Sequence, residues 1–323
     1  MRRRKWLACV LAVCLLLAGL SGCAGQQQPL RVTLVLKTVT EVAEFWGTLL
    51  SGVEEAAAEY GVELKVLTAP REIDIDEQIE LIRQVTAEKP DVMILSASDY
   101  DRCAEATEEA IAAGIGVVAV DTDVNAEGRA CFVGSNNYEV GLEMGRAMAS
   151  YLPEGGKVAV IQHMLTTTTG IDRTRGVIDA LTQAGNIEIL GSFCCDNSTD
   201  RAQAITQELL EREPDISGFV CTNEVCNVGA ANALVELGMG GKVFVVGCDN
   251  SQRQIAFLEQ NIIQAIVTQR PFNMGYMAVQ QAVEVASGEK TEDFVEVPCV
   301  LITRENMYTQ ENQKLLFPLT GES

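Results

Sequence analysis

The chain has 323 residues, of which 47% are hydrophobic and 21% charged, which is typical of a globular protein with about two domains. Its 24 Lys and Arg residues against 45 Asp and Glu residues give a net charge of −21, which argues against a nucleic-acid partner. The single histidine, His163, argues against a histidine-based catalytic triad and against a multi-histidine metal site.

The first 22 residues have the pattern of a secretory leader. Four positive charges at residues 2–5 precede an apolar run, residues 6–20, that is too short to span a membrane. The run ends in Leu-Ser-Gly followed by Cys23, which resembles a bacterial lipobox. That resemblance implies a diacylated Cys23, a tether of residues 23–30 and an extracytoplasmic protein anchored to the cell membrane. The alternative is an ordinary signal peptide that contains a cysteine by chance.

After the tether, apolar runs alternate with helical patterns. Runs of Val, Ile and Leu predict strands of parallel sheets that helices cover on both faces. There are more such units than one sheet usually holds, so the sequence predicts two doubly wound α/β domains. The predicted strands are residues 32–36, 64–67, 92–95, 117–121, 131–133, 158–162, 187–190, 218–221, 243–246, 265–267 and 295–302. The predicted helices are residues 44–60, 75–88, 102–113, 138–151, 171–184, 201–211, 225–237, 253–260 and 273–287.

Polar side chains directly follow many of these strands. The carboxyl ends of parallel strands are where such sheets bind ligands. Carboxylates and amides bond to hydroxyl groups and aromatic rings pack on sugar C–H faces, so a polyhydroxylated ligand is expected. For any one of these residues, the alternative role is a helix cap. The strand-end residues are Lys37, Asp121, Thr122, Asp123, Ser135, Asn136, Asn137, Asn223, Asp249, Asn250 and Gln269, and Phe45 and Trp46 begin the first helix.

The cysteines do not form a metal-binding pattern. Eleven are present, but Cys9 and Cys14 belong to the leader and Cys23 to the lipobox, which leaves eight. None of these lies in a C-x-x-C pair, and no histidine accompanies them. Cys221 and Cys248 sit in apolar strand-like runs, where thiols act as small buried hydrophobic groups. We expect mostly free buried thiols, while the extracytoplasmic location leaves one disulfide possible.

Segments throughout the chain after residue 30 share their order and spacing with one family. They are residues 33–37 with 45–46, 118–121, 134–137 with Gly141, 173–176, 221–224 with 229–230, 245–249, and 268–269 with Gly275. With them the chain resembles the type I periplasmic binding proteins, in particular the ribose-binding branch of sugar receptors for ABC transporters.

The resemblance implies two Rossmann-like lobes joined by three crossings, near residues 135, 270 and 297, that close over a ligand by hinge motion. It places residues 31–134 and 271–297 in the N-terminal lobe. It places residues 135–270 and 298–323 in the C-terminal lobe.

The same resemblance implies the roles of the site residues. Asp121, Arg173, Asn223 and Asp249 would hydrogen-bond to sugar hydroxyls, and Phe45 and Trp46 would stack on the ring. Lys37 and Thr122 would lie beside them, with Gln269 at a crossing. The expected partners are a sugar and an ABC permease. We expect a monomer without enzymatic activity, cofactor or metal.

Three departures from the family pattern leave the ligand open. An acidic loop at residues 40–44 replaces a short turn, and Thr122 replaces an arginine. Lys37 stands where a neutral residue is common in the ribose branch. A lysine at this position also resembles the pattern of receptors for the furanosyl autoinducer. Lys37 would supply the positive charge of the arginine that Thr122 replaces, or it would pair with Glu44 or Asp123. We expect His163 to be a strand-end surface residue.

Several ligands and roles therefore remain. A hexose, a pentose, a polyol or an acidic sugar would each fit the residues. The alternatives are a receptor of the same fold that serves a chemoreceptor or sensor kinase, and a binder of a nucleoside or the furanosyl autoinducer.

Overall fold

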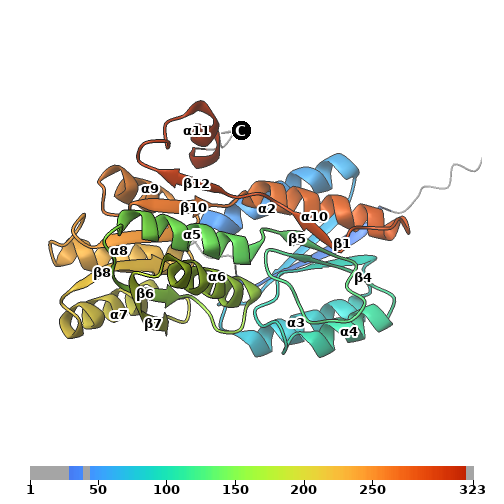
Figure 1. Cartoon of the computed structure of the whole chain (residues 1–323). Helices are drawn as coiled ribbons and strands as arrows, with labels where there is room; N and C mark the ends of the chain where they lie inside the picture. The colour runs from blue at the N-terminus through green and yellow to red at the C-terminus, as the bar shows by residue number, and fades with distance from the viewer. Residues whose placement is uncertain (1–28, 39–43, 318–323) are drawn as a thin grey trace, which may run out of the picture.

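The computed structural model describes residues 29–38 and 44–317, in which strands and helices alternate as the sequence predicts. The leader, Cys23, the tether up to residue 28 and the acidic loop up to residue 43 lie outside the described residues. The strands form two six-stranded sheets, which lie side by side as the cores of two lobes (Figure 1). The prediction of two doubly wound α/β lobes is confirmed.

The first lobe is built on a sheet in which every strand pair is parallel. Its strands are β1 (Arg31–Leu36), β2 (Glu63–Thr68), β3 (Val92–Leu95), β4 (Gly116–Val120), β5 (Cys131–Gly134) and β11 (Phe294–Glu296), and its helices are α2 (Glu44–Tyr60), α3 (Ile75–Glu88), α4 (Ala104–Ala112) and α10 (Pro271–Ala286). The order across the sheet is β11-β5-β4-β3-β1-β2. Helices α2 and α10 pack on one face and α3 and α4 on the other. Successive residues of β1 therefore enter opposite cores: Leu34 packs under α2, and Val35 packs under α3.

The second lobe repeats this plan. Its strands are β6 (Gly156–Gln162), β7 (Ile187–Cys194), β8 (Ile216–Cys221), β9 (Phe244–Cys248), β10 (Ala265–Thr268) and β12 (Val300–Thr303), and its helices are α5 (Asn137–Tyr151), α6 (Thr168–Ala184), α7 (Thr199–Arg212), α8 (Glu224–Glu236), α9 (Gln252–Glu259) and α11 (Gln310–Leu316). The order is β12-β10-β9-β8-β6-β7, which matches the first sheet position by position. Helices α5 and α6 cover one face, while α7, α8 and α9 pack on the other. Short α11, which the sequence pattern did not predict, adds Leu316 to this second core.

The prediction of a single strand at residues 295–302 is wrong. The structure divides it into β11, which pairs with β5, and β12, which runs antiparallel to β10 in the other sheet. Pro298 lies between them, and proline has no N–H group to donate to a strand partner. The backbone N–H of Val297 still donates to Gly134 O at 2.8 Å. The chain thus passes between the two sheets here, as it also does after β5 and after β10.

The eight described cysteines are all free thiols, and six of them are buried. Cys221 and Cys248 are fully buried in the cores on opposite faces of the second sheet. They serve there as the small hydrophobic groups that the sequence predicts.

Candidate functional site

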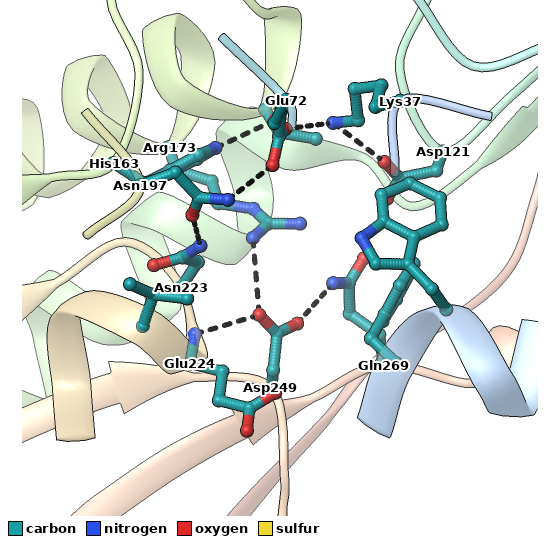
Figure 2. A pocket seen from close by; sticks show the side chains of 14 residues that line it. Lys37, Glu72, Asp121, His163, Arg173, Asn197, Asn223, Glu224, Asp249 and Gln269 are labelled. Carbon is teal, nitrogen blue, oxygen red and sulfur yellow. Dashed lines mark hydrogen bonds and ion pairs between the residues drawn. The ribbon is translucent and has the colours of Figure 1, made fainter. Parts of the chain in front are cut away.

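A cavity lies between the lobes at the carboxyl ends of the strands. Eight of the nine predicted ligand-binding residues line it, and Figure 2 shows most of them pointing toward one another. The lining residues are Lys37, Phe45, Trp46, Glu72, Asp121, His163, Thr169, Arg173, Asn197, Asn223, Glu224, Val225, Asp249 and Gln269.

The ninth residue, Thr122, does not line the cavity. Its side chain is buried, and its hydroxyl oxygen lies 2.9 Å from that of Ser96. The backbone turns at Asp121 and hydrogen-bonds from Thr122 N to Val120 O, which sends the Thr122 side chain toward the neighbouring strand end. Thr122 therefore supports the site from beneath.

Two aspartates occupy corresponding positions in the lobes. Asp121 follows β4 and Asp249 follows β9, the third strand from one edge in each sheet. Both have left-handed backbones, with φ of 64° and 70°. Non-glycine residues rarely adopt this conformation, and such strain is concentrated at functional sites. In both lobes the turn directs a carboxylate into the cavity (Figure 2).

In the first lobe, Lys37 pairs with two buried carboxylates. Its Nζ lies 2.6 Å from Glu72 Oε1 and 3.4 Å from Asp121 Oδ2, and all three side chains are at most 5% exposed. Burial opposes the charge on Lys37, but Glu72 and Asp121 outweigh it and raise the pKa of the lysine. Of the two alternatives for Lys37, the pairing with Glu44 or Asp123 is wrong, because Asp123 pairs with Arg129 and Glu44 accepts from Gln252 N.

The aromatic pair adjoins this charged cluster. The rings of Phe45 and Trp46 pack edge to face with their centroids 5.1 Å apart. Lys37 Nζ lies 5.1 Å from the centre of the Trp46 ring, which adds a cation–π contact. Both aromatic residues line the cavity.

In the second lobe, hydrogen bonds fix Arg173 and Asp249. The Arg173 guanidinium donates to Asn137 Oδ1 and to Thr222 O, both at 2.9 Å, and lies 4.0 Å from Asp249 Oδ2. Asp249 accepts from Gln269 Nε2 at 2.5 Å and from Glu224 N at 3.1 Å. These bonds hold a cation and an anion in place at the cavity wall.

Close helix packing places Arg173. A β-carbon at Gly141 in α5 would lie 2.2 Å from Arg173 O in α6, so only glycine allows this approach. We expect Gly141→Ala to destabilise the fold by about 1–3 kcal/mol, because the helices must separate. The melting temperature would show this as a fall of several degrees. Gly47→Ala is the matched control, since a β-carbon there meets nothing within 4 Å; it should be neutral or stabilising. Equal effects of the two substitutions would contradict the argument.

Hydrogen bonds join the lobes around the cavity. Asn197 Nδ2 of the second lobe donates to Glu72 Oε2 of the first lobe at 2.6 Å. Within the second lobe, Asn197 Oδ1 accepts from Asn223 Nδ2 at 2.9 Å, which fixes the Asn197 side chain. Farther out, Tyr100 N donates to Thr166 O at 2.9 Å. The structure therefore shows the lobes closed on each other.

Several lining residues were not predicted. Asn197 lies just past β7, which runs to Cys194 rather than to residue 190, so the strand-end rule would have found it with the correct strand length. His163 also follows a strand, and its prediction as a surface residue is wrong, because it is 3% exposed. Its ring nitrogens lie 2.8 Å from Thr222 Oγ1 and 3.1 Å from Thr169 Oγ1. Burial, and then the positive charge of Arg173, lower the pKa of His163, which keeps the ring neutral.

Glu224 titrates unusually. Burial, and then the negative charges of Asp249 and Glu44, raise its pKa to about 8. The folded chain therefore holds a proton that the unfolded chain releases above about pH 4, so the free energy of unfolding falls as pH rises from about 4 to 8.

We expect Glu224→Gln to stabilise the fold at pH 8 by roughly 2–3 kcal/mol and much less at pH 5, because the amide cannot ionise. Melting curves at the two pH values measure this difference. Glu236→Gln changes an exposed residue at the end of the same helix and should show no such pH dependence. A gain that is the same at both pH values would argue against a buried, titrating Glu224.

Within the described residues, no cluster of three His, Cys, Asp or Glu side chains suits a metal ion. In the same part of the chain, no helix is long and apolar enough to cross a membrane.

The comparisons with known proteins agree with this architecture. A model of the periplasmic binding protein domain matches residues 33–290. The chain belongs to the periplasmic binding protein family. Among relatives in this family, the D-ribose/D-allose-binding protein of Pseudomonas aeruginosa is 26% identical over 93% of this chain and 98% of its own length. The D-allose-binding periplasmic protein of Escherichia coli is 25% identical over 84% and 91%.

Solved structures of the family show the same fold. A sugar transporter from Clostridium phytofermentans is 30% identical with a TM-score of 0.78, covering 84% of this chain and 98% of its own. A carbohydrate transporter solute binding protein from Agrobacterium radiobacter, in complex with D-arabinose, is 23% identical with a TM-score of 0.86, covering 90% and 100%.

Proposed function

We propose that this chain is an extracytoplasmic solute-binding lipoprotein that captures a monosaccharide or similar polyol and delivers it to an ABC permease. The observation that carries this proposal is the pair of buried aspartates, Asp121 and Asp249, that face one cavity from opposite lobes. Carboxylates accept hydrogen bonds from sugar hydroxyls, Arg173 donates to sugar oxygens, and Trp46 offers a flat apolar face. The sugar names of the relatives support the same ligand class.

The remaining parts of the proposal concern location and organisation. Cleavage of the leader at residue 22 would leave Cys23 to carry the lipid, so the membrane is reached through this anchor alone. We assign residues 31–134 and 271–297 to the N-terminal lobe and residues 135–270 and 298–323 to the C-terminal lobe, which agrees with the sheet to which each described strand belongs. The protein would act as a monomeric receptor without catalysis.

A thermal-shift screen of residues 24–323 tests the ligand class. The panel contains monosaccharides, polyols, uronic acids, nucleosides and amino acids. A ligand at a hundred times its Kd adds about 2.7 kcal/mol to the free energy of unfolding, which raises the melting temperature by several degrees. A shift with one or two sugars supports the proposal. A response to a nucleoside alone would keep the fold and overturn the sugar assignment.

A further inference from the structure

Two thiols lie against each other behind the cavity wall. The Sγ atoms of Cys195 and Cys226 are 3.4 Å apart, and both residues are fully buried. Cys195 lies in the loop between β7 and α7, and Cys226 lies in the first turn of α8. Neither residue lines the cavity, so sugar binding leaves both thiols unused.

These thiols adjoin two residues that do line the cavity. Asn197 follows Cys195 by two positions, and Asn223 precedes Cys226 by three. Cys226 N donates to Asn223 Oδ1 at 3.0 Å, and Asn223 Nδ2 donates to Asn197 Oδ1 at 2.9 Å. A bond between the sulfurs would therefore tie together the two segments that carry this part of the wall.

The loop itself has a strained backbone. Asp196 and Asn197 both adopt left-handed conformations, with φ of 47° and 52°. Two consecutive non-glycine residues in this region cost conformational free energy. A covalent bond beside them would hold the loop in the conformation that places Asn197 at the cavity.

The surroundings of Cys195 favour its thiolate. The hydrogen bond with Cys226, followed by backbone N–H groups of Ser198 and Asn197, outweighs burial and lowers the pKa of Cys195. Burial and the neighbouring sulfur of Cys195 raise the pKa of Cys226. Cys195 is therefore the attacking group, because the thiolate is the nucleophile in thiol–disulfide exchange.

We propose that Cys195 and Cys226 are a redox pair that closes to a disulfide by exchange with a low-molecular-weight disulfide and thereby locks the Asn197–Asn223 wall. The thiolate of Cys195 attacks the oxidant RSSR, forming a mixed disulfide and releasing RS⁻. The thiolate of Cys226 then attacks the Cys195 sulfur and releases the second RS⁻. The protein loses two electrons and two protons, and RSSR becomes two RSH. The sulfurs must approach to about 2.05 Å, a shift of about 1.4 Å.

Peptide mapping after treatment with oxidised glutathione tests the pair. The mature chain is treated both in its folded state and during refolding from urea, so that burial cannot hide the thiols in both arms. The probe is oxidised glutathione, and unreacted thiols are alkylated before digestion. We expect a Cys195–Cys226 peptide and a mass loss of two hydrogens in at least one arm, reversed by dithiothreitol.

The melting temperature distinguishes a disulfide that fits the native structure from one that forms by chance and strains it. Closing the 31-residue separation should raise the melting temperature by several degrees. Cys194→Ser is the matched control, because Cys194 adjoins Cys195 but bonds to Asp196 instead; it should keep the bridge, whereas Cys195→Ser should lose it. Alkylation of all eight thiols in both arms, a bridge through Cys194 or Cys221, or a bridge that lowers the melting temperature would overturn the proposal. The mapping needs only the unmodified sequence, so a variant that fails to fold does not affect it.

Discussion

Replacing Lys37 with methionine is expected to lower the free energy of unfolding by about 3–5 kcal/mol. The substitution keeps the length of the side chain but removes the ammonium group that pairs with the buried carboxylates of Glu72 and Asp121. Breaking a buried ion pair by removing one partner costs this much because the remaining charge has neither water nor a partner. Chemical denaturation followed by circular dichroism measures the loss as a lower midpoint at an unchanged slope.

A surface pair of the same length provides the control. Lys65 Nζ also lies 2.6 Å from a carboxylate, Glu88 Oε2, but the two side chains are 45% and 38% exposed. Water screens this pair, so Lys65→Met should have little effect on stability. If the two lysine substitutions destabilised the chain equally, burial would not be what gives the Lys37 cluster its importance.

Replacing Asp249 with asparagine is expected to weaken sugar binding by about 100-fold while the fold remains intact. Asparagine tolerates the left-handed backbone at this position, whereas alanine would add strain to the effect. The loss arises because the charged acceptor for sugar hydroxyls is gone and Arg173 loses its nearby anion, a cost of about 2–4 kcal/mol. Isothermal titration with the sugar found by the thermal-shift screen measures the change.

The control for this variant is Asp215→Asn. Asp215 pairs with Lys157 and directly precedes the amino-terminal end of β8, whereas the lining residue Asn223 follows the carboxyl end of the same strand. Its substitution should leave the affinity unchanged. Retention of full affinity by Asp249→Asn would remove the carboxylate from the proposed binding set.

Most of the site could be predicted by looking for polar residues that directly follow a predicted strand, because this search depends only on the local sequence pattern. Lys37, Asp121 and Asp249 each follow an apolar run, and parallel strands bring such ends together whatever the loops do. Glu72 could not be found in this way. It lies four residues past β2, and its importance comes from bending over Lys37 and reaching Asn197, which is 125 residues away along the chain.

The wrong predictions share a physical cause. Each concerns a residue or strand whose interaction partner is distant in the sequence and is brought near only by the tertiary fold. Hydrophobic runs do not show that Pro298 separates strands of two different sheets. Charge patterns do not show that Lys37 pairs with Glu72 rather than Glu44. The buried hydroxyls of Thr169 and Thr222 that hold His163 come from segments that meet only in the folded lobe.

The first lobe is assembled from two separate parts of the chain, and this determines when the lobe can complete its folding. Its sheet gains the edge strand β11 and the covering helix α10 only after residue 271, beyond all but one strand of the second sheet. A ribosome must therefore release almost the whole chain before Met274 and Ala278 can close the core over β1. Until then, only α2 covers that face of the first sheet, and this core stays incomplete. Completion of the first lobe therefore depends on residues that are synthesised after most of the second lobe.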